Sequence, residues 1–345
     1  DASGRAGVLA RGRGLRIETN GPRTIAVAGT WQSPGAWPGV DDDSHTLVAS
    51  YADGWAWSVP VGPGLRQFSV MVDPARTNLT RGGDSRDVYL AEIAKAMPFA
   101  SILAQAHLVE GPWGADASVY SAQRYAGPGF VLVGDAGSAI DPLSSFGVKK
   151  ALASAWLGAV ATHTTIVRPA MGAEAFAFFN RREQDIFAAA QRQAARFAAD
   201  AAARVAQPYW TARSGPSVED DGFEPDVNAL VTDPGVQEAF ADLRARPSVN
   251  LTMGRDVSVE PRAAVRGHEI VLEPQILAPA WPRGIRYIRN VDLVQLLQIA
   301  PHHEDVGRIC AVVMKSAPHV ALPDVLGALS VLIATGVVVQ KQPYL

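Results

Sequence analysis

The stretch Gly129-Phe-Val-Leu-Val-Gly-Asp-Ala-Gly-Ser-Ala-Ile-Asp-Pro-Leu-Ser-Ser-Phe-Gly147 decides the fold of this chain. It opens with four apolar residues, 130–133, a pattern typical of a short strand buried in a sheet. Gly134 permits a tight backbone path, and Asp135 presents a carboxylate where the strand ends. Apolar residues then recur at helical spacing through residues 148–160, so a helix is predicted to begin near Gly147.

This strand–loop–helix order suits a cofactor-binding site, and it also suits an ordinary βα turn. Backbone N–H groups at the start of a helix carry partial positive charge and stabilise an anion that faces them. The carboxylate of Asp135 can accept hydrogen bonds from sugar-like hydroxyl groups. The residues by themselves leave both interpretations open.

Residues 134–147 resemble the second flavin motif of FAD-dependent monooxygenases and halogenases, which has Gly-Asp-Ala, a spacer, Asp-Pro, and then Gly and a helix. The resemblance implies that Asp135 binds the ribityl chain of FAD and that Pro142 lies beside the isoalloxazine ring. It also implies that the helix start at Gly147 faces the N1–C2=O edge of the flavin. A helix N-terminus there would stabilise the negative charge of reduced flavin.

The first residues carry the same resemblance. Asp1-Ala-Ser-Gly4 is similar to the segment of these flavoproteins in which a strand ends near the FAD. The Gly-x-Gly-x-x-Gly loop that holds the pyrophosphate in the family is absent from these 345 residues, so the chain is expected to be an N-terminally truncated fragment. The cofactor-binding residues implied by the resemblance are Asp1, Ala2, Gly4, Gly134, Asp135, Pro142, Ser145, Phe146, Gly147 and Val148.

A second motif is Trp55-Ala-Trp57-Ser-Val-Pro60. Strand alternation places Trp55 and Trp57 on one face, where core packing is the alternative to a site. The motif resembles the Trp-x-Trp-x-Ile-Pro signature of flavin-dependent halogenases, with Val in place of Ile. In that family the motif lies between the flavin and the substrate pocket. The resemblance therefore implies that Trp55, Trp57 and Pro60 contact substrate.

Compared with the family that it resembles, this chain lacks part of the expected catalytic residues. Phe146 stands where the family has Thr in a Ser-Thr-Gly segment close to bound halide. The lysine that carries activated halogen in the family belongs to its N-terminal part, so no catalytic residue is assigned in this chain. Lys149 and Lys150 are expected to be solvated residues in the first turn of the helix. No metal site is expected, because His302-His303 lacks Cys or correctly spaced His partners.

The predicted fold class is α/β (α+β): an incomplete Rossmann-like FAD-binding fold with an inserted substrate-side sheet and a helical, winged-helix-like C-terminal module. Strands are predicted at residues 24–31, 68–72 and 119–125, and hairpins at 47–61 and 257–272. Helices are predicted at 87–97, 169–206 and 233–244. Three regions follow: an FAD-binding remainder with the inserted sheet (1–165), a helical substrate-side region with a hairpin (166–285), and the C-terminal module (286–345).

The C-terminal module has three predicted helices, at 291–299, 304–314 and 323–335, followed by a strand at 337–339. The third helix contains no Lys or Arg, which a DNA-binding helix would need, so the module is expected to serve docking or dimerisation. Residues 214–225 are read as a polar acidic linker before it.

Composition narrows the class of protein. The chain is 48% hydrophobic and 19% charged, which is ordinary for a globular protein with a sizeable core. A net charge of −3 argues against nucleic acid or an anionic membrane as partner. The single cysteine, Cys310, lies in an apolar run and is expected to be a buried core thiol. With no apolar run of transmembrane length and no signal peptide, the expected location is cytoplasmic.

The resemblance implies an FAD-dependent oxidoreductase in which a flavin C4a-hydroperoxide hydroxylates or halogenates an aromatic substrate of the indole or tryptophan class. Electrons would come from a flavin reductase or NAD(P)H. Two alternatives stay open: a flavoprotein that modifies an aromatic residue of a partner protein docked on residues 286–345, and a non-catalytic fragment.

Overall fold

The computed structural model describes residues 1–19, 21–77, 85–204, 206–215, 230, 232–246 and 248–341. The chain divides into two compact units, Asp1–Glu219 (unit 1) and Asp220–Leu345 (unit 2). The sequence predicted three regions, with boundaries after residues 165 and 285, and the functions given to those regions stay predictions. The predicted linker at 214–225 lies outside the described residues from residue 216 onward.

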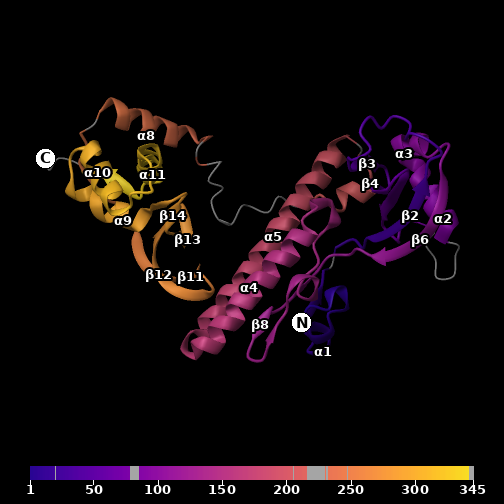
Figure 1. The fold of residues 1–345 in the computed structure, drawn as a ribbon, viewed down its shortest axis with the longest axis horizontal. Coiled ribbons are helices and arrows are strands. Elements are labelled where there is room, and N and C mark those ends of the chain that lie inside the picture. The colour runs from indigo at the N-terminus through magenta and orange to yellow at the C-terminus, as the bar shows by residue number, and fades with distance from the viewer. Residues whose placement is uncertain are drawn as a thin grey trace. The chain divides into compact units, whose positions relative to one another are not determined.

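Unit 1 contains a five-stranded antiparallel sheet with the strand order β3-β4-β5-β2-β6 (Figure 1). Its strands are β2 (Ile25–Gln32), β3 (Leu47–Tyr51), β4 (Gly54–Gly62), β5 (Leu65–Val72) and β6 (His107–Asp116). The predicted strands at 24–31 and 68–72 and the predicted hairpin at 47–61 are confirmed.

Both faces of this sheet are covered by other elements. On one face, Ala56, Phe68 and Val70 pack against helices α2 (Ser85–Lys95) and α3 (Met97–Ile102). On the other face, Trp55 and Met71 pack with Tyr209 and Trp210 of the short helix α6 (Pro208–Thr211), and Trp57 packs against this cluster. The predicted alternation of β4, with both tryptophans on one face, is therefore confirmed.

Two long helices, α4 (Gly147–Val167) and α5 (Gly172–Arg204), lie side by side (Figure 1). The helix predicted to begin at Gly147 is confirmed. The preceding strand is shorter than predicted: β9 covers Phe130–Val131 and pairs with β8 (Ala126–Gly127). The remaining elements of unit 1 are α1 (Val8–Gly12), β1 (Arg16–Glu18) and β7 (Tyr120–Ala122), with β1 paired to β7.

Gly158 lets α4 approach β9 closely. A Cβ atom at this position would lie 2.7 Å from Val133 Cγ1 and 3.2 Å from Val131 Cγ1. We expect Gly158→Ala to lower the free energy of unfolding of unit 1 by about 1–3 kcal/mol, because valine side chains have little room to move. The same change at Gly327 of α11, where a Cβ would meet nothing within 4 Å, should stabilise unit 2 by about 1 kcal/mol. Calorimetry measures the free energy of unfolding of both variants. A Gly158→Ala protein more stable than the wild type would contradict the close packing of α4.

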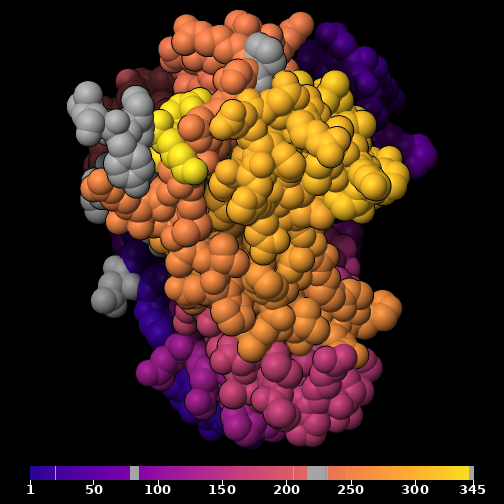
Figure 2. Space-filling model, turned by 90° about the vertical axis from the view of Figure 1, so that its left-hand side faces the viewer, coloured from indigo at the N-terminus to yellow at the C-terminus, as the bar shows by residue number. Residues whose placement is uncertain are grey.

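Unit 2 has its own hydrophobic core, to which helices α8, α9, α10 and α11 and strands β10, β12 and β16 all contribute. Figure 2 shows one face of this unit, with the last third of the chain in orange to yellow. Its elements are α8 (Pro234–Ala245), β10 (Leu251–Met253), β11 (Ser258–Arg266), β12 (Glu269–Ala278), β13 (Trp281–Ile285), β14 (Tyr287–Ile288), β15 (Val291–Asp292), α9 (Leu293–Ile299), α10 (Val306–Ser316), α11 (Leu322–Ala334) and β16 (Val338–Gln340).

The three helices and final strand predicted for the C-terminal module are present, and Cys310 is buried as predicted. The last strand, β16, pairs with β10, which precedes the predicted module boundary at residue 286. The module therefore depends on residues upstream of that boundary. Among the described helices, none combines the length and the apolarity needed to cross a lipid bilayer.

Candidate functional site

The first residues of the chain lie beside the strand that opens the 129–147 stretch. The amino group of Asp1 donates a hydrogen bond of 2.7 Å to the carbonyl oxygen of Val131, and the N–H of Val133 donates one of 3.0 Å to the carbonyl oxygen of Asp1. The short 3₁₀ helices η1 (Gly4–Ala6) and η2 (Gly134–Ala136) contact each other. The structure thus brings together two segments that the sequence analysis linked only by resemblance.

Gly134 makes the turn between β9 and the loop. Its φ is +59°, in the left-handed region, and a Cβ atom here would lie 3.2 Å from the Cβ of Ala151 on α4. Its N–H donates a 3.0 Å hydrogen bond to Ser154 Oγ, also on α4. Both the backbone conformation and the close helix therefore select glycine.

Asp135 follows in η2, and its side chain is half-buried. The hydroxyl of Tyr120 donates a 2.5 Å hydrogen bond to the backbone carbonyl of Asp135. The Asp135 carboxylate itself makes no hydrogen bond or ion pair with the residues that the structure describes. Its two oxygens are therefore available to accept hydrogen bonds from the hydroxyl groups of a ligand.

Tyr120 is a supporting residue that the sequence analysis missed. The guanidinium carbons of Arg16 and Arg5 lie 3.5 Å and 5.0 Å from the centre of its ring. Its backbone also forms a bridge with Ala139 on the far side of the loop. No local motif indicates this role, because Arg16 reaches the tyrosine through the pairing of β1 with β7 and Arg5 comes from η1.

The second half of the loop leads into α4. A 3₁₀ helix, η3 (Pro142–Ser144), is capped by Asp141, whose carboxylate accepts a 2.9 Å hydrogen bond from the N–H of Leu143. Ser145 then takes a left-handed conformation with φ +55°. The first turn of α4 receives no side-chain cap, and a Cβ at Gly147 would meet nothing within 4 Å. An uncapped and sterically open helix start fits an anionic ligand edge.

Phe146 and Val148 border this helix start and are exposed, at 42% and 77%. The Phe146 ring lies 5.3 Å from the ammonium of Lys149. Among the described residues, the cofactor positions implied by the resemblance therefore form one continuous region: the turn at Asp1, the loop at Asp135 and the start of α4. The donor set, with an available carboxylate beside an open helix N-terminus, fits the sugar-alcohol chain and the anionic edge of a flavin.

The expectation that Lys150 is solvated is wrong. Its side chain is 4% exposed, and its ammonium donates a 3.0 Å hydrogen bond to the carbonyl oxygen of Gly134 and a second hydrogen bond to that of Ser138. Burial lowers the pKa of Lys150, while the nearby charges of Glu183 and Asp135 oppose that shift. Lys149, in contrast, is exposed as expected. The difference arises because α4 turns Lys150 towards the loop and Lys149 away from it.

Of the residues proposed to contact substrate, one lines a pocket and two do not. Trp55 is buried and lines a pocket, whereas Trp57 and Pro60 are half-buried and are not among the pocket's lining residues. The indole N–H of Trp57 is buried and has no hydrogen-bond partner among the described residues. Trp57 thus keeps an unused donor near the cluster of Trp55 and Tyr209.

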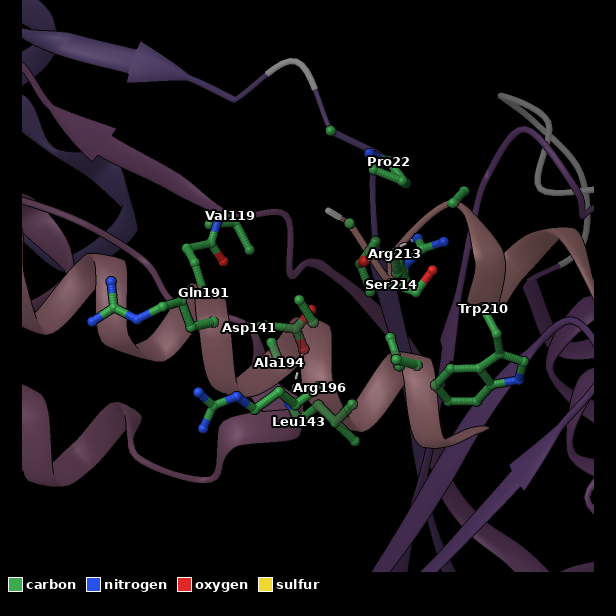
Figure 3. A pocket seen from close by; sticks show the side chains of 18 of the residues that line it. Pro22, Val119, Asp141, Leu143, Gln191, Ala194, Arg196, Trp210, Arg213 and Ser214 are labelled. Carbon is green, nitrogen blue, oxygen red and sulfur yellow. Dashed lines mark hydrogen bonds between the residues drawn. The ribbon is translucent and has the colours of Figure 1, made fainter. Parts of the chain in front are cut away.

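The pocket has a volume of about 610 Å³ and lies between the 141–143 turn, β4, α5 and α6 (Figure 3). Asp141 and Leu143, the neighbours of Pro142, form part of its wall, and Trp55 and Tyr209 supply aromatic surface. Alanines of α5 form an apolar side: Ala188, Ala194, Ala195, Ala198 and Ala199. An aromatic and alanine-lined cavity of this size suits a small aromatic molecule.

Two opposite charges face this pocket. Burial raises the pKa of Asp141, and the charge of Arg213 opposes that shift. Arg213 pairs with the carboxylate of Asp73 at 3.7 Å and donates hydrogen bonds to the carbonyl oxygen of Arg23 (2.7 Å) and to Thr24 Oγ1 (3.3 Å). Its guanidinium carbon lies 3.8 Å from the centre of the Tyr209 ring. The pocket therefore offers both a polar acceptor and a fixed cation beside its apolar wall.

Part of the chain is similar in sequence to known proteins. No family model matches the chain. The tryptophan 2-halogenase of Chondromyces crocatus is 30% identical over 190 residues, which are 54% of this chain and 36% of that protein. The flavin-dependent halogenase gsfI of Penicillium aethiopicum is 31% identical over 176 residues, which are 48% of this chain and 33% of that protein. The chain therefore spans about a third of the length of the curated relatives it matches.

Solved structures show the same fold. The flavin-dependent halogenase CmlS has a TM-score of 0.72 at 20% identity, covering 98% of this chain and 67% of that one. The peptidyl tryptophan dihydroxylase QhpG has a TM-score of 0.59 at 23% identity, covering 87% of this chain and 62% of that one. The mixed α/β fold is that of the FAD-dependent halogenases. About half of the chain is therefore similar in sequence to flavin-dependent halogenases, a tryptophan halogenase among them.

Proposed function

We propose that this protein is a flavin-dependent oxygenase that halogenates or hydroxylates an aromatic substrate, with FAD on the 134–147 loop and the substrate in the neighbouring pocket. The observation that carries the proposal is the position of Pro142. Its neighbours Asp141 and Leu143 line the 610 Å³ pocket, while the same turn leads into the open N-terminus of α4. One turn thus borders both the region suited to flavin and the region suited to an aromatic compound.

Each part of the loop has a binding role in this proposal. Asp135 would accept hydrogen bonds from the ribityl hydroxyls, because its carboxylate has no hydrogen bond within the described residues. The first N–H groups of α4 would face the N1–C2=O edge and stabilise its charge. Asp1 to Gly4 would support the loop through the backbone bonds at Val131 and Val133. The flavin, when bound, supplies the oxygen chemistry.

The pocket residues would orient the substrate and keep water from it. Trp55 and Tyr209 offer ring faces, and the α5 alanines leave room for a flat molecule. Asp141 would accept a hydrogen bond from an N–H or O–H group on the ring. The guanidinium of Arg213, paired with Asp73, would hold the Tyr209 ring in place beside the substrate.

Filling the pocket should separate substrate binding from flavin binding. Ala195 lines the pocket from α5 and is half-buried, so Ala195→Phe places a ring in the cavity. We expect KM for the aromatic substrate to rise about tenfold or more, with flavin affinity unchanged. Ala173→Phe, an exposed position at the start of the same helix, should change neither quantity. Equal KM values for the two variants would place the substrate elsewhere.

The decisive experiment is a reaction of the full-length protein with FAD, a flavin reductase, O₂ and a panel of indoles and phenols, with and without chloride or bromide. A product heavier by one oxygen atom identifies a hydroxylase. A product in which halogen replaces hydrogen, formed only with halide present, identifies a halogenase. Failure of the protein to bind FAD, measured by quenching of flavin fluorescence, would refute the proposal and favour a non-catalytic fragment.

A protein-bound aromatic residue is the second substrate we propose. The dihydroxylase QhpG, whose fold this chain shares, acts on peptidyl tryptophan according to its name. Unit 2 would then serve as the docking module for the protein substrate, or as a dimer contact. A protein partner that binds the intact protein and no longer binds when the whole of unit 2 is removed would support this assignment.

A further inference from the structure

A buried group of polar side chains lies behind the candidate flavin loop, on the side of α4 and α5. Lys150 and Ser154 of α4 bond directly to the loop: Lys150 to the carbonyl oxygens of Gly134 and Ser138, and Ser154 to the N–H of Gly134. Glu183 of α5 completes the group and is fully buried. None of these residues belongs to the pocket or to the positions implied by family resemblance.

Glu183 is a fully buried carboxylate, and the hydroxyl of Ser154 acts on it as a hydrogen-bond donor. A buried carboxylate is costly unless a cation or hydrogen bonds compensate it. Lys150 is the cation whose charge acts most strongly on Glu183, with Arg182 contributing less. Burial raises the pKa of Glu183, and the charge of Lys150 opposes that shift.

The charges of Lys150 and Glu183 act on each other against the effect of burial: the carboxylate raises the pKa of Lys150, and the ammonium lowers the pKa of Glu183. An ammonium bonds carbonyl oxygens more strongly than a neutral amine, so the carboxylate favours the form of Lys150 that holds the loop most strongly.

We propose that Lys150 is a positioning residue for the flavin loop: it clamps the carbonyl oxygens of Gly134 and Ser138 from behind, with Glu183 as its buried counter-ion. The clamp spans Asp135 on both sides, so it sets the direction of the carboxylate that is proposed to bind the flavin. This inference rests on the proposed function only for the identity of the ligand. The clamp itself is a property of the loop without flavin.

The first test is hydrogen exchange on the protein without added flavin. Lys150→Met removes the clamp, and we expect amides of residues 134–147 to exchange about tenfold faster or more, the loss expected for charge-assisted hydrogen bonds. Lys149→Met is the matched control, because the adjacent lysine is exposed, and its loop should exchange at the wild-type rate. Unchanged exchange in Lys150→Met would overturn the proposal.

A double variant separates positioning from general stability. Lys150→Met leaves Glu183 buried without its cation, so this single variant is expected to lose stability for that reason alone. In Lys150→Met/Glu183→Leu both charges are gone, and stability should recover towards wild type. The loop should nevertheless exchange fast, and flavin affinity should stay about tenfold weaker, because the clamp is still missing. Wild-type exchange in the folded double variant would refute the clamp.

The wild-type protein gives a readout that requires no variant. The ammonium protons of Lys150 should exchange slowly enough with water to be observed by nitrogen-15 NMR, whereas those of Lys149 should not. Fast exchange at Lys150 would overturn the proposal. If Lys150 is slow and the variants loosen the loop but the wild type binds no flavin, the clamp stands and the proposed flavin function fails.

Discussion

Replacing Trp210 by alanine is expected to destabilise unit 1 by about 3–5 kcal/mol, the cost of removing a large aromatic side chain from a core. Trp210 is 2% exposed, and its ring meets that of Tyr209 edge-on at 5.1 Å. Its indole N–H donates a 2.8 Å hydrogen bond to the carbonyl oxygen of Tyr51 at the end of β3. The side chain therefore joins α6 to the hairpin that carries the Trp55 motif.

Denaturant unfolding of the full-length protein measures this loss. Trp156→Ala is the matched control, because Trp156 lies on α4 and is 55% exposed, and the change should cost far less. Trp210→Phe keeps most of the ring but removes the N–H, which should cost about 1 kcal/mol for the unmade hydrogen bond and a further amount for the smaller volume. Similar destabilisation by Trp156→Ala and Trp210→Ala would contradict the packing of α6 on the sheet.

Replacing Gly134 by valine is expected to weaken flavin binding by about tenfold to a hundredfold. A β-branched residue at φ +59° costs about 1–3 kcal/mol, and each 1.4 kcal/mol corresponds to a factor of ten. The new Cβ would also press on Ala151 of α4 at 3.2 Å. The loop would relax by moving away from α4, which turns the carboxylate of Asp135 out of place.

Flavin titration by fluorescence measures this effect, and Gly129→Val supplies the control. Gly129 has φ +79° in the turn before β9, and a Cβ there would meet nothing within 4 Å. This variant carries a similar backbone strain outside the loop, so it should lose stability but keep its flavin affinity. Equal loss of affinity in both variants would show that strain alone, and not the shape of the 134–147 loop, governs binding.

Local backbone properties explain why the position of the loop was predictable from the sequence. Gly134, Pro142 and Gly147 mark turns and the helix start by their backbone properties, which depend on neighbours a few residues away. Strand alternation placed Trp55 and Trp57 on one face, and the structure confirms it. Such local rules also located the sheet strands and the three C-terminal helices.

Contacts between distant segments were beyond these rules. The burial of Lys150 follows from α5, which covers that side of α4 and contributes Glu183. The support of Asp135 by Tyr120 follows from the pairing of β1 with β7. The pocket combines a turn, a strand and two helices, so Trp55 lines it while Trp57, two residues away on the same face, does not.

The sequence by itself determined the loop, the helix that follows it and the resemblance to flavin-dependent halogenases, because glycine, proline and apolar spacing act over a few residues. Tertiary structure alone decided which charges are buried and which side chains meet. Burial depends on the segments that fold over a residue. The sequence around Lys150 does not indicate that α5, with Glu183, will cover it.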